Sequence, residues 1–186
     1  MHRSLLAALL AFLLAGCIRT VGPDYELKPD SSRSVIIVSL TASGRIPAEF
    51  LFYLRPVGDN LSLQGRSIQV FGPTRGIVDW PILKGGNPPD QPPGRLAVLE
   101  IAPGDYEFFR WSGVVGGFVN QNAVPFSKRF EVRAGEVIYL GNLHLARRGD
   151  QQWSVTTADL RDRDFPLLEK KLPNVPPQRV AIRLLK

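Results

Sequence analysis

From residue 34 onward, short runs of β-branched and aromatic residues alternate with segments rich in glycine, proline and asparagine. Runs of this length and composition are typical of β-strands, and the segments between them are typical of turns. No stretch shows the long 3.6-residue apolar period of a helical bundle. The pattern predicts strands at 34–41, 49–55, 96–102, 106–111, 126–133, 136–145, 152–157 and 178–185, with a weaker one at 67–71.

Several runs alternate between apolar and polar residues, as strands do when one face is buried and the other is exposed. Phe130 and Val132 alternate with charged residues, and the pattern places the odd-numbered residues of 137–145 on one face. In the last run, the even-numbered residues of 180–184 are apolar and two of their neighbours are arginines. We expect these apolar sets to face the core.

Two turn sequences lie between apolar runs. Pro103 and Gly104 follow the run 96–102, and Ala134 and Gly135 follow the run 126–133. Proline and glycine in such positions favour tight turns. The two turns therefore predict two β-hairpins at the centre of the domain.

One segment, 164–172, carries the signals of a short helix. Asp164 stands at a capping position, Pro166 falls in the first turn, and Pro173 follows the last residue. At about two turns, this helix is a lid or a connection. Together the patterns predict an all-β fold, an antiparallel β-sandwich of about 7–9 strands with one short helix near 164–172.

The amino terminus has the composition of an export signal. Arg3 precedes an apolar stretch over 5–15, which at about 18 Å as a helix is too short to span a bilayer. The stretch ends in four residues that resemble the lipobox of bacterial lipoproteins: Leu14, Ala15, Gly16 and Cys17. The resemblance implies cleavage before Cys17 and acylation of this cysteine, which anchors the chain to a membrane.

This resemblance divides the chain into a signal peptide at 1–16, a lipidated cysteine with a tether at 17–33, and one domain at 34–186. The tether is expected to be extended because 18–33 is polar and contains prolines. Ile18 stands where an aspartate commonly retains lipoproteins in the inner membrane, so the resemblance implies the outer membrane, facing the periplasm. The alternative is an ordinary secreted protein that keeps one cysteine.

The body of the chain contains two segments of the form strand, tight turn, tyrosine-containing strand, at 96–109 and 130–140. They resemble the small prealbumin-like or carboxypeptidase-regulatory-like β-sandwiches of bacterial lipoproteins. The resemblance implies a domain that binds or supports other molecules and does not catalyse.

The chain holds 23 Lys and Arg against 17 Asp and Glu, a formal net charge of +6. The basic residues are spread along the sequence, and none of their runs exceeds two residues. Nucleic-acid binders gather such charge on one face, so a nucleic-acid partner is not expected. The charge suits an anionic lipid or polysaccharide surface, or it serves solubility alone.

Few residues offer catalytic or metal-binding chemistry, because the chain has one cysteine and two histidines. Beyond the leader, His144 is the only histidine, and we expect it on a strand face opposite Leu143 and Leu145, as a structural or surface residue. We expect no metal and no cofactor. Asp159, Asp162 and Asp164 alternate with arginines, which indicates a solvated loop with local ion pairs; the alternative is a hydrolase that uses these carboxylates.

Two loops are candidates for partner contact. The segment 84–95 is rich in glycine and proline and includes Asn87, Pro88 and Pro89, so it is either an exposed docking segment or a plain connection. The glycine-rich segment 112–124 carries the apolar residues Val114, Val115 and Phe118. It is either a hairpin tip that touches a partner or membrane, or a loop folded over the end of the sandwich.

The aromatic residues suggest a possible sugar-stacking surface, with core packing as the default: Trp80, Trp111, Trp153, Tyr53 and Tyr106. Trp111 and Tyr106 are an odd number of positions apart on one predicted strand, which places them on opposite faces. The sequence as a whole predicts a lipid-anchored envelope lipoprotein that acts as a non-catalytic interaction module with an envelope protein as its partner. The alternative is a ligand-binding module for envelope polysaccharide or a small amphiphile.

Overall fold

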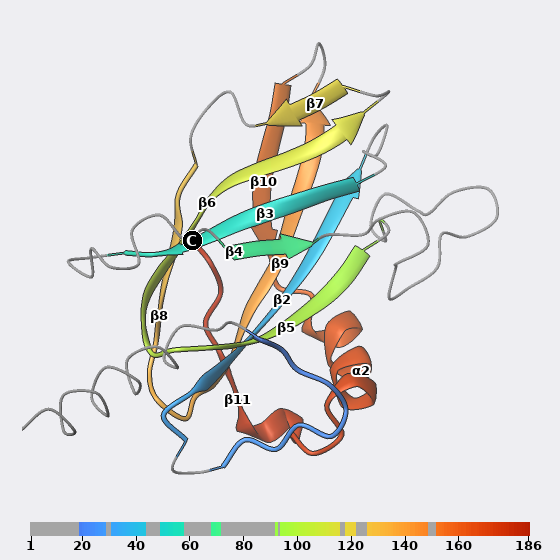
Figure 1. The fold of residues 1–186 in the computed structure, drawn as a ribbon. Helices are drawn as coiled ribbons and strands as arrows, with labels where there is room; N and C mark the ends of the chain where they lie inside the picture. Colours follow the sequence, from blue (N-terminus) through green and yellow to red (C-terminus); the bar gives the residue numbers. More distant parts are fainter. Residues whose placement is uncertain are drawn as a thin grey trace, which may run out of the picture.

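The computed structural model describes residues 19–28, 31–43, 49–57, 68–71, 92, 94–115, 118–121, 126–148 and 152–186. Eleven strands in these residues form two sheets, which face each other as the two layers of a sandwich (Figure 1). The predicted all-β sandwich is confirmed, and each predicted strand overlaps a strand of the structure.

Sheet A contains six strands, in the order β1 (Arg19–Thr20), β5 (Gly94–Ile101), β2 (Ser34–Ser43), β9 (Val137–Arg148) and β10 (Gln152–Ala158), with β11 (Val180–Ile182) also paired to β9. Sheet B contains five, in the order β4 (Ile68–Phe71), β3 (Glu49–Pro56), β6 (Gly104–Val115) and β7 (Phe118–Gln121), with β8 (Lys128–Val132) also paired to β6. Sheet B is antiparallel, whereas β2 and β11 run parallel to β9, so sheet A is mixed.

The main core fills the space between the two sheets. Phe52 of β3 lies near its centre, with its ring edge-to-face against the rings of Phe50, Phe108 and Phe126. Apolar side chains from alternate positions of β2, β5 and β9 close the core from the other sheet. As predicted, Phe130 and Val132 of β8 face this core.

The two turn sequences connect the sheets and do not form hairpins. Pro103 lies between β5 of sheet A and β6 of sheet B, and Gly104 is the first residue of β6. Ala134 and Gly135 lie between β8 of sheet B and β9 of sheet A. The predicted central hairpins are therefore wrong. A tight turn shows where the chain reverses, whereas the pairing depends on which neighbouring strand completes each apolar face.

A bulge in β9 changes the face on which its residues lie. Ile37 and Ser39 of β2 pair with Tyr139 and Asn142 of β9. The β2 residues are two positions apart and the β9 residues three, so β9 has one extra residue here. Gly141 lies in this bulge with φ of +90°, a conformation that glycine adopts readily. The predicted alternation over 137–145 is therefore wrong, because Tyr139 lies on the outer face of sheet A and Leu143 and Leu145 lie in the core.

The helix α2 (Arg161–Lys171) lies on the outer face of sheet A (Figure 1). The predicted helix is present, but it begins three residues earlier, so Asp164 and Pro166 lie inside it and Asp164 is not its cap. A second apolar cluster fills the space beneath the helix, with Leu168 and Leu172 packed against the outward residues of β2, β5 and β9.

The segment 19–28, which the sequence indicated as part of the tether, packs on the same face. β1 pairs with β5, and Leu27 is buried in the second cluster. Val21 and Tyr25 pack against this cluster as well. Burial of these apolar side chains offsets the entropy lost on ordering the segment, so it belongs to the folded domain.

The last predicted strand is also shorter than expected. Ile182 and Leu184 are 39% and 38% exposed, whereas Leu185 is buried in the main core. The amides of Arg183 and Leu185, two residues apart, donate to the carbonyls of the adjacent residues Tyr139 and Leu140, beside the β9 bulge. The alternation expected for 180–184 fails there, because the bulge shifts the phase of the neighbouring chain.

Two helical segments occur in the described residues, α2 and the short η2 (Pro177–Arg179). Among the described residues, no helix is long and apolar enough to cross a membrane.

Candidate functional site

A second bulge shapes the outer face of sheet B. The adjacent β3 residues Tyr53 and Leu54 pair with Arg110 and Phe108 of β6, so Phe109 is an extra residue in β6. Phe108 and Trp111 on either side are buried in the main core. Phe109 and Arg110 therefore both lie on the outer face, which is how bulges redirect side chains.

These two residues stack with two residues of β3. The Arg110 guanidinium lies 4.1 Å from the centre of the Tyr53 ring, and the Arg55 guanidinium lies 4.3 Å from the centre of the Phe109 ring. The two rings are 6.4 Å apart. Such cation–π contacts at exposed sites contribute about 0.5–1 kcal/mol each. We call Tyr53, Arg55, Phe109 and Arg110 the Arg–aromatic surface.

A buried carboxylate fixes one edge of this surface. Glu107 is 5% exposed, and Arg55 donates from Nε and Nη2 to its Oε2 at 2.9 and 2.8 Å. Burial alone would favour the neutral acid, but hydrogen bonds from Ser127 and Arg55 and the charges of Arg55 and Arg129 hold the pKa of Glu107 below its ordinary value. The ionised Glu107 therefore keeps Arg55 in its stacked position.

The surface combines half-buried aromatic rings with exposed guanidinium groups. Tyr, Phe and Arg are enriched at the centres of protein–protein interfaces. Arg55, Arg110 and Arg129 are exposed, and Glu107 pairs with Arg55 and Arg129. Among the described residues, the part of the face around the Arg–aromatic surface thus carries more positive than negative groups.

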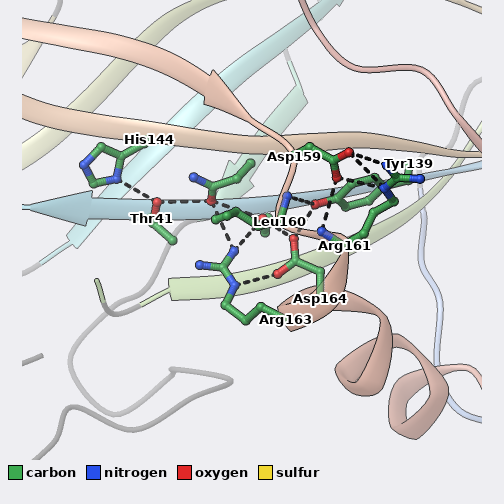
Figure 2. Close-up of polar contacts among 10 residues, drawn as sticks. Thr41, Tyr139, His144, Asp159, Leu160, Arg161, Arg163 and Asp164 are labelled. Atoms are coloured by element: carbon green, nitrogen blue, oxygen red, sulfur yellow. Dashed lines mark hydrogen bonds and ion pairs between the residues drawn. The ribbon is translucent and has the colours of Figure 1, made fainter. Parts of the chain in front are cut away.

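The outer face of sheet A holds a different group of polar residues, at the junction with α2 (Figure 2). Asp164 is fully buried, and Tyr139 Oη and Ser39 Oγ each donate to its Oδ2 at 2.7 Å. Arg163 Nε donates to Oδ1 at 2.8 Å. Three donors compensate the carboxylate for the loss of water.

The hydrogen bonds continue from Ser39 toward His144. Thr41 Oγ1 donates to Asn142 Oδ1 at 3.1 Å, and it lies 2.8 Å from His144 Nδ1. Ser43 Oγ lies 2.9 Å from His144 Nε2. With Thr41 donating to Asn142, His144 Nδ1–H donates to Thr41, and a neutral ring then accepts at Nε2 from Ser43. We call Ser39, Thr41, Ser43, Tyr139, Asn142, His144, Arg163 and Asp164 the buried polar network.

The network favours uncharged His144 and uncharged Tyr139. Burial lowers the pKa of His144, and the nearby positive charge of Arg163 lowers it further. Burial raises the pKa of the Tyr139 hydroxyl, and the negative charge of Asp164 raises it further. At neutral pH the histidine and tyrosine therefore serve as neutral hydrogen-bonding groups that join β2, β9 and α2.

The three aspartates of the 159–164 segment lie in different environments. Asp164 is buried in the network, so the predicted solvated loop is wrong for this residue. Asp159 forms an exposed ion pair with Arg161 at 2.7 Å, as predicted, and Asp162 is exposed. His144 lies on the face opposite Leu143 and Leu145, which confirms its predicted orientation.

A third feature is a cavity of about 300 Å³ beside β1, where the edge of β5 meets β4 and the end of α2. Its lining combines apolar residues of the sandwich with three cations at the ends of β5 and α2: Arg95, Lys170 and Lys171. This volume lies at the lower end of the range for small-molecule sites.

The predicted contact loops have different outcomes. Val114 and Val115 belong to β6 and Phe118 to β7, so this segment is a hairpin, with Val115 opposite Phe118. Asn87, Pro88 and Pro89 lie outside the described residues, as do the lipobox residues Leu14, Ala15, Gly16 and Cys17.

The aromatic residues mostly serve the core. Trp111 is 1% and Tyr106 is 6% exposed, and both face the main core because the β6 bulge lies between them. The prediction that they lie on opposite faces is therefore wrong. Trp153 packs against Trp111 at 5.2 Å between ring centres, and Trp80 lies outside the described residues.

Sequence reasoning missed both the Arg–aromatic surface and the buried polar network. Signals for each were present: two consecutive phenylalanines before Arg110 break the period of two, as at a bulge. Ser39, Thr41 and Ser43 place a polar residue at every second position of an apolar strand.

The described residues contain no group of three His, Cys, Asp or Glu side chains placed to hold a metal ion. Comparison with known proteins finds no family whose model matches the chain and no curated protein that is similar to it.

Proposed function

We propose that this chain is a lipid-anchored protein of the bacterial cell envelope, whose β-sandwich binds another envelope protein and does not catalyse. Acyl chains on Cys17 hold it at the membrane, on the outer membrane facing the periplasm. The Arg–aromatic surface is the observation that carries the binding role, and the partner presents an acidic surface to it.

The anchor is supported by the leader and by the place where the folded domain begins. The apolar stretch ends in the lipobox-like residues before Cys17, and β1 begins at Arg19, two residues later. A fully extended chain spans at most about 3.6 Å per residue, so the domain begins at most about 7 Å from the acylated cysteine. The sandwich is thus held close to the bilayer.

The binding role is supported by the order of the Arg–aromatic surface. Arg55 is held by Glu107 and stacked on Phe109, and Arg110 is stacked on Tyr53. Long side chains that are ordered before binding lose less entropy when a partner arrives. A partner can therefore use these arginines without the usual cost of fixing them.

A binding role is also favoured over hydrolysis because the side chains that could take part in catalysis are engaged in structural hydrogen bonds. Asp164 and His144 are occupied by hydrogen bonds within the buried polar network. Glycoside hydrolysis needs two carboxyl groups that flank the scissile bond. Of the three aspartates, one is buried and two are on the surface.

The binding proposal is tested by crosslinking in intact cells, followed by purification of the chain and mass spectrometry. We expect one dominant envelope protein with the wild type and about tenfold less of it with Arg110→Ala, as for an interface hot spot. Arg179→Ala removes the same charge from an exposed position in η2 and should leave recovery unchanged. Equal recovery with both variants contradicts the proposal.

The anchor is tested separately by Cys17→Ala, which should release the chain from the membrane fraction, whereas Ile18→Ala, which keeps the cysteine, should not. Retention of the Cys17→Ala chain on membranes contradicts acylation at this residue.

The cavity beside β1 favours a second candidate function, a ligand-binding module for a small amphiphile. Both apolar side chains and cations line it, and such a molecule needs both kinds of contact.

A further inference from the structure

We propose that the cavity beside β1 binds the phosphate-bearing headgroup of an anionic phospholipid from the membrane that holds Cys17. This inference rests on the acylation of Cys17 proposed above. It names the class of amphiphile that the second candidate function, ligand binding, would involve, and the cavity where the amphiphile binds.

The lining of the cavity has an apolar part and a cationic part. Val70, Leu96 and Val98 are buried side chains that contribute to the apolar wall. Arg95 and Lys170 also line the cavity, and none of the described residues that line it is acidic. Apolar surface suits glycerol and the first methylene groups of an acyl chain, and cations suit a phosphate.

The position of the cavity in the chain connects it to the membrane. Thr20 lines the cavity and follows Cys17 by three residues, a distance of at most about 11 Å when fully extended. Acyl chains on Cys17 enter the bilayer at its surface, so the cavity is held at the depth of the headgroups. A headgroup next to the anchor can therefore reach Arg95 and Lys170.

The test uses the full acylated chain in nanodiscs that contain phosphatidylglycerol or phosphatidylcholine with a photoactivatable headgroup. After irradiation, mass spectrometry locates the lipid adducts on the chain. We expect adducts at 95–99 and 170–171 that are about 25-fold more abundant with phosphatidylglycerol, since Arg95 and Lys170 each contribute about fivefold near an anionic surface. Inorganic phosphate in solution should not compete.

Matched variants give the second comparison. Arg95→Gln/Lys170→Gln should lower the adducts at these positions about 25-fold, and Arg179→Gln/Lys186→Gln, which removes the same charge elsewhere, should change them less than about twofold. Equal adducts with both lipids, competition by inorganic phosphate, or no loss in the first double variant overturns the proposal. If acylation itself is wrong, the chain is not recovered with the nanodisc, which is a different result.

Discussion

The outer face of sheet A is covered by other segments of the chain, whereas the outer face of sheet B carries exposed side chains. The outer face of sheet A is covered by α2 and the segment 19–28, and its polar residues form a network in which Asp164 is fully buried. The outer face of sheet B carries Arg55 and Arg110 in exposed positions over aromatic rings. In both sheets a bulge decides which side chains reach the outer face.

The difference teaches how one architecture separates stability from binding. Polar groups that are buried and mutually bonded hold elements together, and removing one leaves the others without partners. Polar groups that are stacked but exposed lose little when one is removed, and they remain accessible to another molecule. Substitutions on sheet A should therefore change stability, and substitutions on sheet B should change binding.

The largest expected effect is that of Asp164→Ala. It leaves Tyr139, Ser39 and Arg163 without their common acceptor, and we expect the free energy of unfolding to fall by about 3–5 kcal/mol in urea denaturation. Asp162→Ala, two residues away on the exposed side of α2, should change it by less than about 0.5 kcal/mol. Equal small effects would show that the network does not hold the helix on the sheet.

The β9 bulge gives the next prediction. A Cβ atom at Gly141 would lie 2.8 Å from the carbonyl oxygen of Ala158, at a φ of +90°. Gly141→Ala should therefore destabilise the fold by about 1–3 kcal/mol in the same measurement. Gly22→Ala is the control, because a Cβ there meets nothing within 4 Å. If both substitutions are tolerated alike, the bulge does not depend on glycine.

A smaller effect concerns pH. The pKa of His144 is lowered in the folded chain, so the unfolded chain binds a proton at this residue more readily. The stability that is present above about pH 6.5, the ordinary pKa of histidine, is therefore lost as the pH falls below that value. Urea denaturation between about pH 5.5 and 7.5 should show this decline in the wild type. His144→Gln should reduce the slope, and an unchanged slope would assign the decline to other groups.

A small change in stability is expected for Arg110→Ala on sheet B. The lost contact with Tyr53 contributes about 0.5–1 kcal/mol at an exposed site, so the unfolding midpoint should shift only slightly. A loss as large as that of Asp164→Ala would mean that both outer faces serve stability, and the comparison would fail.

Much of the fold could be predicted because strands depend on local patterns. Alternation predicted that Phe130 and Val132 face the core, and short β-branched runs predicted the strands. The pairing of β2 parallel to β9 could not be predicted, because it joins residues about a hundred positions apart. The bulges at Gly141 and Phe109 then shifted the side-chain phase within strands whose presence was predicted, although β6 and β9 extend beyond their predicted bounds.

The candidate site was less predictable for the same reason. Asp164 has no local signal for burial, because its acceptor role depends on Ser39, which is 125 positions away in the sequence. The stacking of Arg110 on Tyr53 depends on strand pairing and on a bulge. Hydrogen bonds and stacks between distant segments are set by tertiary structure, which local pattern does not encode.

The central claim, that the outer face of sheet B binds an envelope protein, is tested most directly by a photocrosslinking amino acid placed at single positions in living cells. Position 110 lies on the Arg–aromatic surface, and position 156 is exposed on β10 of sheet A. We expect a discrete product with one envelope protein from position 110 and none from position 156. No product from position 110, or the same product from both positions, would contradict the account.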